Sequence, residues 1–202
     1  NQIVRFDLNT NSYKSLLIKA GYRYSNLSIS NAGDQVAFFE SKSTGVANAV
    51  LKVMNLNSGA LQDVNLDRVI TQLKWSADDS KLFLTPQDQG AVPIMEYSFA
   101  NKKFKTLTST MEGVLGFDEH GEQFIYAKTA IENPSELYYL SNNKEVRLTD
   151  LNTIWLKDKQ LSKAVKHQFI NKVGQTIDYW VMKPAGYVPG KKYPLVVEIH
   201  GG

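Results

Sequence analysis

The sequence predicts an all-β fold: a partial β-propeller of about three four-stranded blades plus part of another, followed by the first strands of a truncated second domain. One supporting observation is a repeat in which Ile29, Trp75 and Phe117 occupy equivalent positions, 46 and 42 residues apart, which is the length of a propeller blade. Another is the apolar run at residues 195–199, which ends in glycines. Such a run is typical of a strand buried on both faces of a parallel sheet.

The first half of the repeat predicts one hairpin per blade. It consists of a short strand, a turn rich in Ser, Asp, Asn and Gly, and a second alternating strand, at residues 27–39, 73–84 and 115–126. That order is a hairpin signature. We expect the blades to start near Leu27, Ile70 and Gly113. The side chains expected to be buried between neighbouring blades are Ile29, Trp75 and Phe117 on the first strands, and Val36, Leu82 and Phe124 on the second strands.

The second half of the repeat predicts the other hairpin of each blade. Its copies are residues 53–61, 96–104 and 138–146, and an orphan copy at residues 5–13 opens the chain. Two hairpins per period make four antiparallel strands. A β-sandwich is the alternative, because sandwiches also place strands about 8 to 12 residues apart. Three copies of both half-repeats in one order favour the propeller, and the period-two patterning excludes long helices.

The pattern changes at Asp150, where we place the domain boundary. Residues 1–149 are predicted to be propeller blades, and residues 150–202 a linker and the beginning of a second domain. A connector with a helix-like turn at residues 151–158 precedes a hairpin whose turn is residues 172–175. A Pro- and Gly-rich loop then leads to the apolar strand. Because no residues remain to cover that strand, we expect the sequence to be the front part of a longer protein.

The end of the chain resembles the start of an α/β-hydrolase domain, in the order hairpin, Lys-Pro-Ala-Gly-Tyr loop, Lys-Lys-Tyr-Pro, apolar strand and His-Gly-Gly. With a propeller upstream, the whole resembles the prolyl oligopeptidase family of serine peptidases, in its acylaminoacyl-peptidase and dipeptidyl-peptidase-like branch. The most specific part runs from Gly174 to Gly202. The resemblance implies a parent that hydrolyses short peptides through a Ser-His-Asp arrangement, with the propeller gating access.

The candidate catalytic group is the backbone N–H of Gly202, flanked by His200 and Gly201. Glycines let backbone N–H groups approach a substrate closely. In α/β-hydrolases the loop after the third strand supplies one oxyanion-hole donor, and the resemblance assigns that role to Gly202. His200 is then a structural or turn residue, because the family's catalytic base lies near the far C-terminus. A purely structural Gly-Gly turn is the alternative.

The nucleophile, acid and base are absent from this chain. No Gly-x-Ser-x-Gly motif occurs in the 202 residues, so the sequence holds no nucleophile elbow. In the family these groups follow the His-Gly-Gly segment. We therefore expect the chain by itself to be inactive, and a Gly-x-Ser-x-Gly motif in the residues that follow would settle the class.

Composition excludes several other kinds of chemistry. The sequence has no cysteine, which excludes disulfides, thiolate zinc sites and thiol catalysis. Its three histidines share no metal-ligand spacing with carboxylates, so we expect no metal and no cofactor. Asp78 and Asp79 fit a turn better than a cation site. Residues 132–136 are expected to form a surface loop, although such loops can face the substrate cavity in the family.

The expected partner is a short peptide in the parent protein. The basic cluster at residues 102–105 is best explained as a solvated hairpin turn, so we expect no nucleic acid. No apolar stretch approaches the roughly 20 residues of a membrane helix, and residues 1–4 show no signal-peptide pattern. Self-association through exposed strand edges is expected. The compartment stays open between cytoplasm and periplasm, with a weak lean to the periplasm.

Two other functional interpretations remain. A non-catalytic propeller could bind proteins or ligands, but a pure binding module has no need of an apolar strand ending in His-Gly-Gly. An esterase or lipase would keep the hydrolase chemistry, but those enzymes are usually gated by helical caps.

Overall fold

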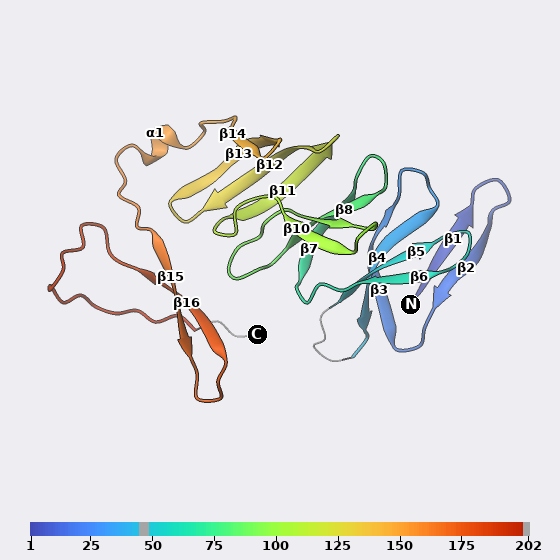
Figure 1. Ribbon diagram of the computed structural model, residues 1–202, viewed down its shortest axis with the longest axis horizontal. Coiled ribbons are helices and arrows are strands. Elements are labelled where there is room, and N and C mark those ends of the chain that lie inside the picture. The colour runs from blue at the N-terminus through green and yellow to red at the C-terminus, as the bar shows by residue number, and fades with distance from the viewer. Residues whose placement is uncertain (45–48, 200–202) are drawn as a thin grey trace. The chain divides into compact units, whose positions relative to one another are not determined.

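The computed structural model describes residues 1–44 and 49–199, and its regular structure is almost entirely β-strand (Figure 1). Three four-stranded antiparallel sheets follow one another along the chain, with a two-stranded sheet before them and another after them. The predicted all-β, partial-propeller fold is confirmed. The chain divides into two units, Asn1–Ala130 with Ser135–Asp150, and Ile131–Pro134 with Leu151–Gly202.

The sheets are meanders, in which strands adjacent in sequence are also neighbours in the sheet. The opening hairpin pairs β1 (Gln2–Asp7) with β2 (Ser12–Ile18). The first sheet contains β3 (Tyr22–Ile29), β4 (Gln35–Lys42), β5 (Val50–Asn55) and β6 (Leu61–Val64). The second contains β7 (Ile70–Trp75), β8 (Lys81–Pro86), β9 (Met95–Ser98) and β10 (Lys103–Thr106). The third contains β11 (Gly113–His120), β12 (Gln123–Ala130), β13 (Asn133–Ser141) and β14 (Lys144–Arg147).

The second and third sheets start where the sequence predicts, at Ile70 and Gly113, whereas the first starts five residues before Leu27, at Tyr22. The hairpin of β11 and β12 is tighter than expected. Its turn is Gly121 and Glu122, both with positive φ. Two consecutive positive φ values are the mark of a type I′ turn, whose twist matches that of antiparallel strands. Strand β11 therefore continues through His120.

The core of the first unit lies between the sheets. Val36, Leu82 and Phe124 are buried as predicted. Trp75 is only 5% exposed; its ring stacks on Phe99 and its indole N–H donates a hydrogen bond of 3.0 Å to the carbonyl oxygen of Ser28 in the first sheet. The indole therefore ties the second sheet to the first.

The equivalent positions in the other sheets are less buried. Phe117 is half-buried against the core between the second and third sheets. The prediction for Ile29 is wrong, because its side chain is 64% exposed. Trp75 packs back onto the first strand of the preceding four-stranded sheet, whereas only the hairpin of β1 and β2 precedes the sheet of Ile29. Ile29 therefore lacks an equivalent surface to pack on.

The predicted polar loop at residues 132–136 is also different in the structure. Strand β13 begins at Asn133 and takes in most of the segment. Glu136 is buried and forms an ion pair of 3.0 Å with Arg147 on β14. A buried carboxylate is tolerated only when it is paired, and the guanidinium meets this need.

The second unit contains a short helix and a hairpin. Helix α1 (Thr153–Leu156) has Asn152 as its N-cap residue, and β15 (Ala164–Ile170) pairs with β16 (Thr176–Met182) in an antiparallel hairpin, as the sequence predicts. Within residues 1–44 and 49–199, no helix has the length and apolar character required to cross a membrane.

The apolar run at residues 195–199 is not a strand in the structure, so that prediction is wrong. Four of its side chains, Leu195, Val196, Val197 and Ile199, are at least 68% exposed. A strand of this kind forms only when neighbouring strands pair with its backbone N–H and C=O groups. In the described part of the chain none does. The start of an α/β-hydrolase domain therefore stays a prediction.

Candidate functional site

The predicted oxyanion-hole segment, Gly202 with His200 and Gly201, lies outside the described residues. The chain approaches it through a locally folded loop that follows β16. The rings of Tyr187 and Tyr193 are 5.4 Å apart, and the Tyr193 hydroxyl accepts a hydrogen bond of 3.0 Å from the backbone N–H of Val188. The Lys183 amino group lies 4.5 Å from the centre of the Tyr187 ring. These contacts close the loop on itself.

The hairpin of β15 and β16 has one polar and one aromatic face. On the polar face, Asp178 accepts a hydrogen bond of 2.8 Å from Gln168 and forms an ion pair of 3.1 Å with Lys166. The hydrogen bonds from Gln168 and then Lys166 lower the pKa of Asp178. On the aromatic face, His167 stacks on Tyr179 with a ring separation of 5.3 Å. The contacts of His167 are therefore those of a packing residue.

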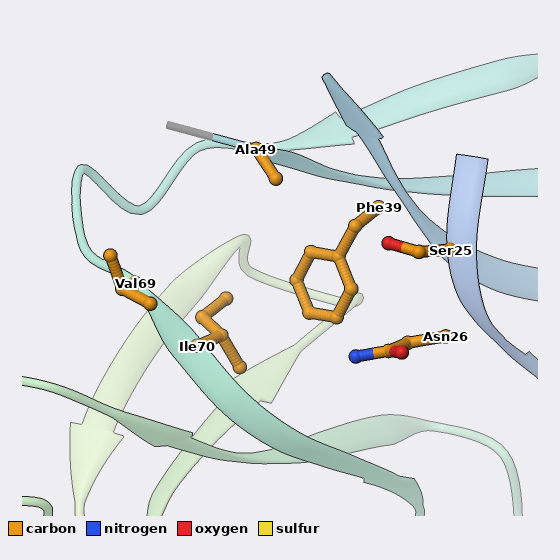
Figure 2. Close-up of a pocket in the computed structure, with 6 residues that line it drawn as sticks. All are labelled: Ser25, Asn26, Phe39, Ala49, Val69 and Ile70. Carbon is orange, nitrogen blue, oxygen red and sulfur yellow. The ribbon is translucent and has the colours of Figure 1, made fainter. Parts of the chain in front are cut away.

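A small cavity of about 150 Å³ lies between the first and second sheets. Figure 2 shows the Phe39 ring with Ile70 and Val69 on one side and the polar side chains of Ser25 and Asn26 on the other. The remaining lining residue is Ala49. The cavity therefore has an apolar wall and a hydroxyl and an amide group at its edge.

An irregularity in β3 creates this edge. The pairing of β3 with β4 shifts register between Ser25 and Ser28, and Asn26 has a φ of 51°. Asparagine adopts this left-handed conformation more readily than most residues, and a bulge re-aims the side chains around it. The sequence pattern does not predict this feature, because the alternating run begins only at Leu27. The sequence signal for the bulge is the pair of polar residues, Ser25 and Asn26, directly before the alternating run.

The third sheet contains an ionic cluster around the buried Lys128, and its contacts explain it as a structural feature. Lys128 on β12 pairs with Glu145 at 2.5 Å and with Glu112 at 3.1 Å, and its amino group lies over the ring of Tyr138. Burial works to lower the pKa of Lys128, but the hydrogen bonds to Glu145 and Glu112 outweigh it and raise the pKa. Burial, and next a hydrogen bond to Glu145, raise the pKa of Tyr126. Lys128 therefore stays protonated, and its ion pairs join β12 to β14 and to the segment before β11.

Asp78 and Asp79 form the expected turn. Asp78 accepts hydrogen bonds from the hydroxyls of Ser76 and Ser80, which lower its pKa to about 2. The Asp79 carboxylate accepts hydrogen bonds of 2.8 Å from the backbone N–H groups of Asn31 and Ala32, which lie in the turn of the first sheet. Asp78 therefore stabilises its own turn, and Asp79 joins that turn to the turn of the first sheet. Among the described residues, no group of three or more His, Asp or Glu side chains could hold a metal ion.

The repeated four-stranded meanders and their packing define part of a β-propeller. No family model matches the chain. It is 26% identical over 130 residues to the uncharacterized peptidase YuxL of Bacillus subtilis, which covers 63% of this chain and 20% of YuxL. It is 24% identical to dipeptidyl-peptidase 5 of Schizosaccharomyces pombe, over 99% of this chain and 30% of that protein. The chain thus spans less than a third of the length of these relatives, which are peptidases.

Solved structures give the same result for the fold. The acylaminoacyl peptidase of Pyrococcus horikoshii matches with a TM-score of 0.68 and 20% identity, over 86% of this chain and 27% of that one. An acylaminoacyl peptidase in complex with Z-Gly-Gly-Phe-chloromethyl ketone matches with a TM-score of 0.71 and 21% identity, over 91% and 28%. The β-propeller domain of the Trilobed protease from Pyrococcus furiosus matches with a TM-score of 0.57 and 18% identity, over 70% of this chain and 44% of that one. The resemblance to peptidases of the prolyl oligopeptidase family is confirmed over most of this chain.

Proposed function

We propose that this chain is part of a serine peptidase that hydrolyses short peptides by acyl transfer, in which the propeller limits access to the catalytic centre. The observation that carries the proposal is the similarity to dipeptidyl-peptidase 5 over 99% of the chain. That similarity includes the residues after Asp150 as well as the repeats. On this proposal residues 1–149 are propeller blades, and residues 150–202 are a linker and the N-terminal portion of an α/β-hydrolase domain.

The role proposed for Gly202 is electrostatic. When a serine oxygen attacks the peptide carbonyl carbon, negative charge develops on the carbonyl oxygen, and the backbone N–H of Gly202 donates a hydrogen bond to it. The C–N bond then breaks and the amine leaves with a proton from the histidine, which earlier took it from the serine. A donor of this kind contributes about 3 kcal/mol of transition-state stabilisation. The serine, histidine and acid are supplied by residues outside this chain.

The proposal is tested with the full-length parent and with this chain, assayed side by side on fluorogenic short peptides and on an unfolded protein. We expect the parent to cleave the short peptides and to leave the long chain intact, because a propeller admits only small substrates. This chain alone should cleave neither. A parent that cleaves no peptide but binds a protein partner would favour the non-catalytic binding module. Cleavage of simple esters without peptides would favour the esterase alternative.

Turnover by the purified 202-residue chain would contradict the proposal if it were lost on substitution of one of its own residues. Equal cleavage of short peptides and the unfolded protein by the parent would contradict the gating role while leaving the peptidase activity in place.

A further inference from the structure

A second cavity, of about 280 Å³, lies between the second and third sheets at the end that carries the hairpin turns. One wall is a row of side chains across the second sheet. Phe83 on β8 is paired in register with Glu96 on β9, and Glu96 is paired with Lys105 on β10. Directly paired residues of an antiparallel sheet project from the same face, so these three side chains form one continuous surface.

The third sheet supplies the other wall. It consists of the turn Gly121–Glu122, the start of β12, the end of β13 and the turn Asn142–Asn143. Phe124 on β12 contacts Phe83 edge to face, with ring centres 4.9 Å apart, and both side chains are buried. Phe83 and Phe124 lie behind this wall with almost no exposed surface, whereas Leu107 is a half-buried apolar residue of the lining, and charged and amide groups surround the opening.

The opening carries charged side chains of both signs. Lys81 lies 3.6 Å from Glu96 and forms a second ion pair with Glu122 across the two sheets. One ammonium thus serves two carboxylates, and with Lys105, which is directly paired with Glu96 across the strands, the opening carries two positive and two negative side chains. Lys105 lines the same cavity, and within the described part of the chain it forms no ion pair. The opening can therefore accept both a cationic and an anionic group.

We propose that this cavity binds a small zwitterion with an ammonium and a carboxylate group, namely a free amino acid or a dipeptide. The ligand's ammonium group pairs with Glu96 and Glu122, its carboxylate pairs with Lys105, and an apolar side chain lies against Leu107. The volume is near the lower end of the range for small-molecule sites, about 300 to 1,000 Å³, which limits the ligand to one or two amino-acid residues. This binding does not depend on the peptidase activity proposed above.

The test is isothermal titration calorimetry of the full chain with glycyl-leucine, and with the same dipeptide acetylated and amidated so that both charges are removed. We expect saturable binding with a Kd of about 1 mM or tighter for the zwitterion, and at least about tenfold weaker binding for the capped form. Charge-assisted hydrogen bonds are the strong ones, so Lys105→Gln and Glu96→Gln should each weaken binding about tenfold or more. Lys103→Gln, on the same strand but outside the cavity lining, is the matched control and should bind like the parent.

Absence of saturable glycyl-leucine binding would overturn the proposal, as would equal binding of the capped dipeptide. Full affinity in Lys105→Gln would overturn the assigned role of the ligand's carboxylate. Glu96→Gln changes a half-buried side chain, so a thermal melt accompanies it. If that variant unfolds, the capped dipeptide and Lys105→Gln, on the outermost strand, still decide the outcome.

Discussion

The indole of Trp75 is the side chain that most directly joins two sheets. It is buried, stacks on Phe99 and donates a hydrogen bond to the first sheet. Trp75→Ala should therefore lower the free energy of unfolding by about 3 to 5 kcal/mol, as expected for truncation of a buried aromatic residue. Urea unfolding followed by circular dichroism measures this loss.

Ile29→Ala is the matched control, because Ile29 occupies the equivalent place in the preceding repeat but is exposed. It should change the free energy of unfolding by no more than about 0.5 kcal/mol. Equal losses for the two variants, or a Trp75→Ala protein as stable as the parent, would contradict the packing described here.

Because of Asp78, the stability of the fold depends on pH in the acid range. Its pKa is about 2 in the folded chain, against an ordinary value of 3.8, because hydrogen bonds from the Ser76 and Ser80 hydroxyls favour the carboxylate. A carboxyl group whose pKa is lower in the folded chain than in the unfolded chain stabilises the fold at pH values above its unfolded-state pKa. This contribution to stability is lost as the pH falls through the folded-state pKa. The melting-temperature difference between the parent and Asp78→Asn should therefore shrink between about pH 4 and pH 2. A constant difference over that interval would refute the assignment.

At the scale of elements, exposed strand edges and the apolar run after Tyr193 predict association. The side chains of residues 195–197 and 199 are largely exposed, and unpaired strand edges are templates for pairing with another chain. We predict that the chain self-associates, or that the run folds back on the hairpin of β15 and β16. Light scattering separates these outcomes, and removal of residues 193–202 should reduce any association. A strict monomer with a protease-sensitive tail would contradict both.

The elements could be predicted from sequence where their cause is local. Alternation and turn residues are sufficient for the β7–β8 hairpin, and burial of Val36, Leu82 and Phe124 follows from their place in the repeat. The exposure of Ile29 depends on which sheet precedes it, and a central strand at residues 195–199 depends on neighbouring strands. The residue pattern within one segment predicts neither the exposure of Ile29 nor the absence of a strand at residues 195–199.

The cavities are also beyond local reasoning. The Ser25 and Asn26 edge comes from a bulge whose effect appears only when the second sheet is packed against the first. The position of Lys105 directly beside Glu96 is visible only in the register of β9 with β10. The catalytic assignment to Gly202 came instead from the resemblance of the chain's end to a family, and it stays a prediction.

At the scale of the whole molecule, the central claim is that the chain belongs to a serine peptidase whose nucleophile lies outside these 202 residues. The most direct test is to label the full-length parent with a fluorophosphonate, which reacts with activated serines, and to locate the modified residue by peptide mass spectrometry. We predict a single labelled serine after Gly202, within a Gly-x-Ser-x-Gly sequence, and loss of peptide cleavage in step with labelling. A labelled residue within positions 1–202, or peptide cleavage that persists after complete labelling, would contradict the claim.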